Sequence, residues 1–268
     1  MISELWFIGA RVTITLVVLF YSSWSDYKTR EVSNRVWAIY APVAIAIVVP
    51  ELLIFESSKL LLFGASVGII IGLAFLLFYT GGFGGADSKA LMCMAIALPF
   101  APASTTPLVN DFVSPTSQFI YPLTIFSNAV LFAAASAVYM MIRNILWHRK
   151  NGKAFFAGTL SKESVSKKIL VLITGYKVTT AKLKEKWHIF PMEDVEVNDD
   201  LMRKLVVVPH DEGRNEVVER LVSAANDGKI DSYVWATPGL PMLIFITLGL
   251  IVALLYGDLV WMLVRFFF

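Results

Sequence analysis

Long apolar runs separated by short polar connections occupy most of the chain. A helix crosses the hydrocarbon core of a membrane with about 20 mostly apolar residues. Six runs approach or exceed that length: Leu5–Trp24, Val36–Phe55, Leu60–Thr80, Ala90–Val109, Phe112–Ile142 and Val234–Gly257. Pro99, Pro102 and Pro107 indicate that the fourth helix ends early. The pattern predicts an all-α polytopic membrane protein, a bundle of six transmembrane helices.

The stretch between the fifth and sixth runs has a different composition. Between His148 and Tyr233 lie 15 of the 23 Lys and Arg residues and 13 of the 21 Asp and Glu residues. We therefore expect helices 1–5 in residues 1–147, a small α/β domain in residues 148–233 and the last helix in residues 234–268. Lys168–Thr174 and Leu205–Pro209 are typical of short buried strands, and residues 179–186 and 216–227 of amphipathic helices.

The composition excludes several classes of protein. Hydrophobic residues make up 57% and charged residues 16% of the chain, whereas soluble globular chains contain about 25% charged residues. The net charge of +2 comes from nearly balanced charges in the insert, so nothing indicates a nucleic-acid partner. A single cysteine, Cys93, excludes an intramolecular disulfide framework and a multi-cysteine metal cluster.

Basic residues predict the orientation in the membrane. The first connection contains Lys28, Arg30 and Arg35, the third contains Lys89, and the fifth is the charged insert. The second connection has one lysine and the fourth has no basic residue. The positive-inside rule therefore places the odd connections and the insert in the cytoplasm, in a multi-pass protein of the cell membrane. Arg11 then lies in the outer half of the first helix, where its side chain can reach the interface.

Two carboxylates are the strongest candidates for chemistry. The sequence has no H-E-x-x-H motif, no histidine inside an apolar run and no Gly-rich phosphate loop. Asp26 follows the first run and Asp87 the third, so both reach the cytoplasmic end of the bundle and meet if these two helices pack together. Two close carboxylates share a proton, which allows one to activate water while the other polarises a carbonyl.

The same residues also fit roles without this chemistry. Either aspartate alone is also typical of a solvated helix cap, and the cluster of four glycines at residues 81–85 is consistent with a hinge or with room for an extended substrate. A membrane transporter could use Asp26 and Asp87 to bind a cation or proton. A non-enzymatic adaptor could use the insert as its interaction module. A transporter site is expected near the midplane within repeats, and no repeat is visible.

Three motifs together resemble a known family. G-G-A-D at Gly84–Asp87, followed by Lys89, is similar to the G-x-G-D signature of intramembrane-type aspartyl peptidases. The stretch SDYKTREVSNRVW, with Asp26, Arg30 and Asn34, resembles the first aspartate motif of the type IV prepilin peptidases and their archaeal preflagellin peptidase branch. The segment TPGLP, residues 237–241, is similar to the start of their last helix. Ala86 departs from the pattern, since it replaces the third-position glycine with another small residue.

The resemblance implies a specific activity. Asp26 and Asp87 would form the catalytic dyad, with no metal and no cofactor. The substrates would be preflagellin or prepilin-like precursors, each with a short basic leader before a hydrophobic helix, cut at the cytoplasmic face of the lipid bilayer. The motif also marks residues that are candidates for substrate binding: Gly84, Gly85, Ala86, Lys89, Pro238 and Pro241. From the residues themselves, Lys89 is also consistent with an interface charge, and the prolines with the start of a helix. The sequence does not predict an oligomeric state.

Overall fold

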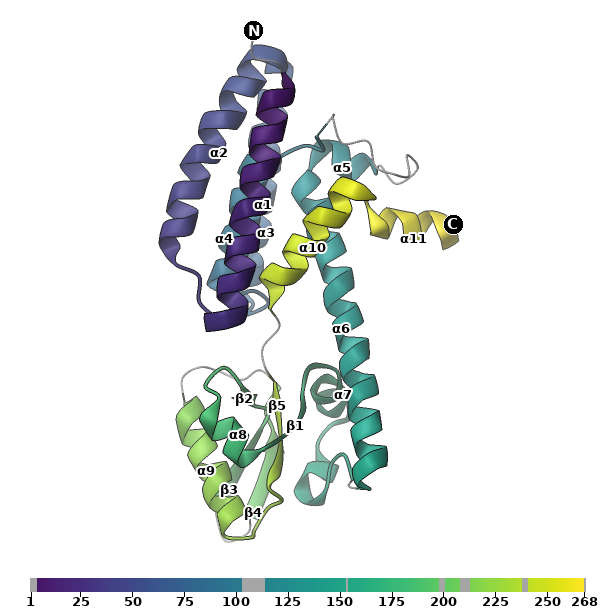
Figure 1. Cartoon of the computed structure of the whole chain (residues 1–268). Helices are drawn as coiled ribbons and strands as arrows, with labels where there is room; N and C mark the ends of the chain where they lie inside the picture. The colour runs from purple at the N-terminus through teal and green to yellow at the C-terminus, as the bar shows by residue number, and fades with distance from the viewer. Residues whose placement is uncertain are drawn as a thin grey trace. The chain divides into compact units, whose positions relative to one another are not determined.

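The fold consists of two compact units, shown in a computed structural model (Figure 1). The structure describes residues 4–102, 114–152, 154–197, 201–207, 213–237 and 241–267. Residues 1–133 and 241–268 form the first unit, and residues 134–240 form the second. Helix α6 contributes its first part to the first unit and its remainder to the second.

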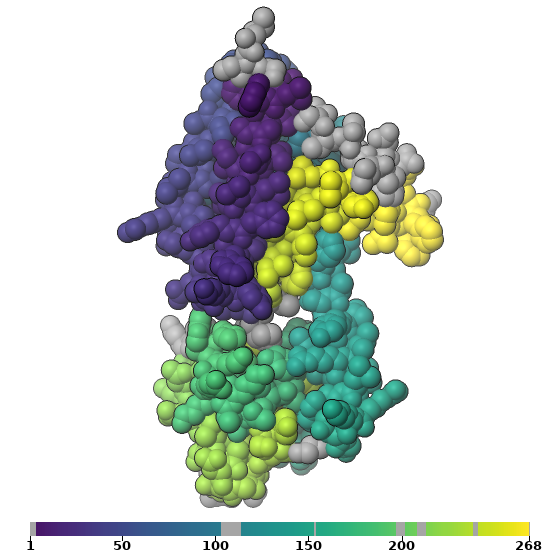
Figure 2. Space-filling model, viewed as in Figure 1, coloured from purple at the N-terminus to yellow at the C-terminus, as the bar shows by residue number. Residues whose placement is uncertain are grey.

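The first unit is helical. Its elements are α1 (Glu4–Thr29), α2 (Asn34–Phe55), the 3₁₀ helix η1 (Ser57–Lys59), α3 (Leu60–Tyr79), α4 (Gly85–Ala97), α5 (Pro115–Phe119), the start of α6 (Tyr121–Asn151), α10 (Met242–Leu255) and α11 (Leu259–Phe267). The short helix α4 packs against α1, α2, α3 and α10. Its small and apolar side chains, including Ala90, Leu91 and Met94, are fully buried. Figure 2 shows α1 and α10 side by side on one face, consistent with their contacts.

The apolar helices identify a membrane protein, although the predicted number of spans is not confirmed. Within the described ranges, α1, α2, η1 with α3, and α6 are long and apolar enough to cross a membrane. The pair α10 and α11, bent by 66°, would make a fifth span if it is one broken helix. The run expected to cross at Ala90–Val109 instead forms α4, a helix of 13 residues that ends before Pro99. Residues 103–109 of that run lie outside the described residues.

Arg11 does not reach the interface as expected. Its side chain is only 7% exposed, and Nη2 lies 3.2 Å from Oε1 of Glu51 on α2. An uncompensated charge in an apolar bundle is costly, whereas a paired one is retained. The ion pair therefore joins α1 to α2 inside the first unit.

The second unit combines helices with two small antiparallel sheets. Its elements after α6 are η3 (Gly158–Lys162), α7 (Val165–Thr174), β1 (Tyr176–Thr179), α8 (Thr180–Glu185), β2 (Phe190–Pro191), β3 (Glu193–Val197), β4 (Leu201–Leu205), α9 (Arg214–Asn226) and β5 (Tyr233–Thr237). The larger sheet has the order β1-β5-β2, with Tyr176 opposite Ala236 and Phe190 opposite Thr237. Strands β3 and β4 form a separate hairpin.

Two predicted helices of the insert are confirmed and two predicted strands are not. Residues 179–186 and 216–227 correspond to α8 and α9, and Val218 and Leu221 of α9 are buried. The strand expected at Lys168–Thr174 is instead helix α7, because the Oγ of Ser164 accepts a hydrogen bond from the Lys167 N–H and starts a helix there. The strand expected at Leu205–Pro209 is also wrong, since β4 ends at Leu205 and residues 208–209 lie outside the described residues.

The sixth predicted span begins too early. Val234–Thr237 belongs to β5, the central strand of the larger sheet, and the helix begins only at Met242. A short apolar run suits a buried strand as well as a helix, so hydrophobicity alone did not separate the two.

The close approach of α10 to α6 generates a prediction about stability. A Cβ atom at Gly249 would lie 2.4 Å from the carbonyl oxygen of Ile125 and 2.9 Å from the backbone nitrogen of Ala129. Gly249→Ala should therefore lower the free energy of unfolding by about 1–3 kcal/mol, the usual cost of overpacking. Thermal unfolding of the purified protein in detergent measures the effect.

Gly68 on α3 provides the matched control, since a Cβ there has no heavy atom within 4 Å. Gly68→Ala should leave the melting temperature unchanged or raise it, because alanine favours a helix over glycine. Equal melting temperatures for the two variants would contradict the tight packing of α10 on α6.

Candidate active site

Asp26 lies in the last turn of α1, where several contacts hold the chain as it leaves the helix. Arg30 follows the helix in the left-handed region with φ of 58°, and its N–H donates to the carbonyl of Asp26 at 2.9 Å. The Ser25 hydroxyl donates to the carbonyl of Glu31 at 2.7 Å, and the Thr29 hydroxyl donates to the same carbonyl at 3.1 Å. The backbone around Asp26 is therefore fixed by local hydrogen bonds.

Asp87 lies in the first turn of α4, directly after the glycine loop that follows α3. The N–H of Gly84 donates to Asp87 Oδ2 at 3.1 Å. A Cβ at position 84 would lie 3.2 Å from the same oxygen, so a larger residue would press on the carboxylate. Gly81 has φ of 74°, a conformation that favours glycine. The loop therefore brings its backbone close to Asp87 in a way that side chains would prevent.

Helix α1, which carries Asp26, packs on α4, which carries Asp87. The sequence suggested that the first and third apolar helices would bring the aspartates together, but Asp87 is carried by α4. Contacts between α1 and α10 fix α1 near Asp26, since the Ser23 hydroxyl donates to the Leu243 carbonyl at 2.9 Å and lies 2.8 Å from the Thr247 hydroxyl. Such interhelical hydrogen bonds are typical of membrane bundles.

Burial and a neighbouring charge both perturb Asp87. Burial raises the pKa of Asp87 to about 7, and the carboxylate of Asp26 contributes to this rise in pKa against the opposing hydrogen bond from Gly84. The charge of Asp26 therefore acts in the same direction as the burial of Asp87, and both favour the protonated form of this carboxyl group. A carboxyl group with a pKa of about 7 beside a second carboxylate is suited to general acid–base chemistry near neutral pH.

Lys89 connects α4 to the start of α2. Its Nζ donates to Asn34 Oδ1 at 2.7 Å. Ser33 caps the same end of α2 by accepting a hydrogen bond from the Arg35 N–H. The lysine thus holds together the two segments that follow Asp26 and Asp87.

The remaining motif residues have simpler surroundings. A Cβ at Gly85 would make only ordinary contacts with Phe78 and Lys89, and Ala86 packs against the hydrophobic core. Pro241 precedes the first turn of α10, and its carbonyl accepts a hydrogen bond from Ile244 at 3.0 Å. Pro238 lies outside the described residues. Across the ranges that the structure describes, no group of three or more His, Cys, Asp or Glu residues could hold a metal ion.

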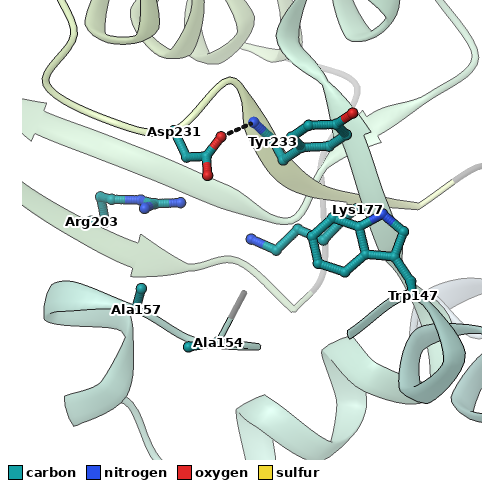
Figure 3. Close-up of a pocket in the computed structure, with 7 residues that line it drawn as sticks. All are labelled: Trp147, Ala154, Ala157, Lys177, Arg203, Asp231 and Tyr233. Carbon is teal, nitrogen blue, oxygen red and sulfur yellow. Dashed lines mark hydrogen bonds between the residues drawn. The ribbon is translucent and has the colours of Figure 1, made fainter. Parts of the chain in front are cut away.

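A cavity of about 220 Å³ lies in the second unit. In Figure 3 the ends of Lys177 and Arg203 point toward the carboxylate of Asp231, which accepts a hydrogen bond from the Tyr233 N–H at 3.2 Å. Arg203 also pairs with Glu193 at 2.9 Å. Charges of both signs therefore balance in and around this cavity.

Two family models match the chain. Residues 13–142 match the type IV leader peptidase family, and residues 167–259 match the archaeal peptidase A24 C-terminus, type II. The first match includes both Asp26 and Asp87. The chain belongs to the type IV leader peptidase family. This leader peptidase family member is therefore a protease of the membrane, and the transporter and adaptor alternatives lose their support.

Similar proteins extend the match over nearly the whole chain. A preflagellin peptidase of Methanococcus voltae is 27% identical over 258 residues, which are 91% of this chain and 94% of that protein. A preflagellin peptidase of Methanococcus maripaludis is 22% identical over 249 residues, 90% of this chain and 92% of that protein.

The sequence alone assigned no function to several polar residues of this leader peptidase family member. Asn34 lies in the first aspartate motif, but its hydrogen bond to Lys89, 55 positions away, exists only in the folded chain. Ser23 and Thr247 stand out in sequence only as hydroxyl residues within apolar runs. That signal is weak, since many such hydroxyls bond to their own helix, as Thr15 does to Arg11.

The contact between Lys89 and Asn34 predicts a measurable coupling. Asn34→Ala and Lys89→Met should each lower the free energy of unfolding by about 0.5–1.5 kcal/mol, since each removes the hydrogen bond. The double variant should lose no more than the larger single effect, as measured by thermal unfolding in a double-mutant cycle. Asn34→Asp, which keeps an acceptor, serves as the control and should retain stability. Additive losses in the double variant would show that the two side chains do not interact.

Proposed function

We propose that the chain removes leader peptides from preflagellin or prepilin-like precursors, using Asp26 and Asp87 as an aspartyl dyad at the cytoplasmic face of the membrane. The observation that carries the proposal is the coupling of a partly buried Asp87 to the charge of Asp26 beside a glycine loop. The family assignment and the preflagellin peptidases similar to the chain support the substrate class.

The chemistry follows from one proton shared by two carboxyl groups. The ionised aspartate takes a proton from water, and the resulting oxygen forms a bond to the scissile carbonyl carbon. The protonated aspartate gives its proton to the carbonyl oxygen, which yields a neutral tetrahedral diol. The aspartate that took the water proton gives it to the amide nitrogen while the other aspartate accepts a proton from a diol hydroxyl, so the C–N bond breaks and a carboxylic acid and an amine are released. Because the pair titrates as a unit, its two apparent pKa values belong to the dyad as a whole.

The glycine loop supports binding of an extended substrate segment. Gly81, Gly82 and Gly84 are exposed and present backbone without side chains next to Asp87. The N–H groups of Gly81, Gly82 and Gly84 donate within the loop, to the carbonyls of Phe78 and Leu77 and to Asp87, so the loop offers room for an extended chain rather than free donors. Gly85, Ala86, Lys89, Pro238 and Pro241 complete the proposed motif, with Lys89 holding the loop side of α4 to α2.

Charge supports the cytoplasmic placement of the site. Lys28, Arg30 and Arg35 follow Asp26, and Lys89 follows Asp87, so the two aspartates share a basic end of their helices. The proposed soluble domain, residues 148–233, lies on the same side in this arrangement.

Removal of either carboxylate should abolish cleavage. Asp26→Asn and Asp87→Asn each leave a group that cannot exchange the required proton, so the rate should fall at least about 100-fold. Purified variants are incubated with a preflagellin precursor, and mass spectrometry measures the free leader. Asp227→Asn, at an exposed position that ends α9, is the matched control and should cleave normally. Normal cleavage by either dyad variant, with an unchanged melting temperature, would refute the dyad.

The pKa of Asp87 predicts the pH dependence. Burial first, and the charge of Asp26 second, raise the pKa of Asp87 to about 7, so this carboxyl keeps its proton below that pH and loses it above. With both carboxylates ionised the dyad has no acid, so kcat/KM should fall by about tenfold per pH unit above about pH 7. Initial rates measured in detergent from about pH 5 to about pH 9 give the profile. A rate that stays constant to the highest pH would contradict a shared proton on this pair.

A further inference from the structure

Helix α7 of the second unit presents apolar side chains to the outside. Val165, Ile169 and Leu170 are 69%, 51% and 41% exposed, whereas Val171 on the same helix is fully buried. A surface helix normally turns its apolar stripe toward the core and its polar side outward. An outward apolar stripe indicates that something apolar covers this helix.

The end of α7 is fixed to the membrane helix α6. The Nδ2 of Asn144 on α6 donates to the carbonyls of Leu172 and Gly175 at 2.8 and 2.7 Å. Within one turn of Asn144, Ile142, Ile145 and Leu146 of α6 are exposed, and the guanidinium of the exposed Arg143 lies 4.3 Å from the centre of the Tyr176 ring. The carboxyl end of α7 therefore lies level with a part of α6 that carries an apolar outer surface.

The length of α6 indicates that its segment around Asn144, which holds the end of α7, lies at the edge of a bilayer. Its 31 residues extend about 46 Å at 1.5 Å per residue, whereas the hydrocarbon core is about 30 Å thick. The last turns of α6 must therefore reach the headgroup region, where its terminal residues His148, Arg149 and Lys150 are suited to lie. Because Asn144 precedes these residues by one turn, α7 is held at the boundary between hydrocarbon and water.

Basic residues accompany the apolar side of α7. Lys162 precedes the helix, and Lys167 and Lys168 lie in its first turns. Lys167 pairs with Glu163 at 3.0 Å, and Lys168 donates to the carbonyl of Ser161, so both ammonium groups are held close to the helix. Apolar side chains combined with lysines are typical of helices that lie in the interface of a membrane with anionic lipids.

We propose that α7 is an interfacial helix that lies flat in the headgroup region of the bilayer. Val165, Ile169 and Leu170 enter the boundary of the acyl chains, and the lysines at its start contact anionic headgroups. This surface anchors the second unit to the membrane independently of the peptidase chemistry.

Spin labelling of the full chain in vesicles tests this placement. Ile169→Cys is labelled with a nitroxide, and Val165→Cys provides a second position on the same face. Ser223→Cys, on an exposed position of α9, is the matched control. The native Cys93 is 5% exposed, and the labelled parent chain measures any background from it. Collision rates are recorded with oxygen, which concentrates in the bilayer, and with a water-soluble nickel chelate, in vesicles of phosphatidylcholine with and without phosphatidylglycerol.

The expected result is that the labels at positions 165 and 169 collide several-fold more with oxygen than with nickel, and that the label at 223 shows the reverse. Adding phosphatidylglycerol should deepen the α7 labels, and Lys167→Gln with Lys168→Gln should remove that increase. Labels on α7 that are as accessible to nickel as the label at 223 would overturn the proposal. Protection from both reagents, with broadening from nearby spins, would overturn it in favour of a second copy of the chain. An unchanged depth on adding phosphatidylglycerol would overturn the contact with anionic headgroups.

Discussion

The burial of one carboxyl group at the start of a short central helix determines much of the first unit. Asp87 accepts a hydrogen bond from the Gly84 N–H, and its pKa rises because the carboxyl group is desolvated by burial and the charge of Asp26 acts on it. A side chain at position 84 would press on this carboxylate, so the glycine loop and the acidic group depend on each other. The position of α4 relative to the surrounding helices therefore determines where this carboxyl group lies.

Polar contacts between helices provide that fixation. In a lipid environment the apolar side chains of different helices gain little from meeting each other, so close packing and hydrogen bonds specify their arrangement. Arg11 pairs with Glu51, the Tyr40 hydroxyl donates to Thr15, and Ser23 bonds to Thr247 and Leu243. Together with the contact between Lys89 and Asn34, these bonds connect α1, α2, α4 and α10, the helices around the candidate dyad. Mutations at these positions would therefore change the packing of the helices that carry Asp26 and Asp87.

The second unit uses apolar residues in two distinct ways. Its core is formed by buried residues of the sheets and of α9, such as Trp235, Val234 and Leu221. Helix α7 instead exposes its apolar side, beside the end of a helix that is longer than a bilayer is thick. An outward apolar face next to lysines is suited to contact with the surface of a bilayer.

Residue order and composition were enough to predict the membrane class and the insert with its α8 and α9 helices. They also carried the resemblance to a peptidase family, which the family models confirm, and indicated the two aspartates as the candidate dyad. These features are local properties of the chain, so motif spacing and composition carry them. The helix at residues 168–174 and the strand at Tyr233–Thr237 depended instead on packing, because an apolar run of about five to seven residues fits a strand and a helix equally well. The early end of the fourth helix, by contrast, followed from its prolines. The pairing of Arg11 with Glu51 and of Lys89 with Asn34 likewise required the folded chain, since partners 40 and 55 positions apart meet only when the helices pack.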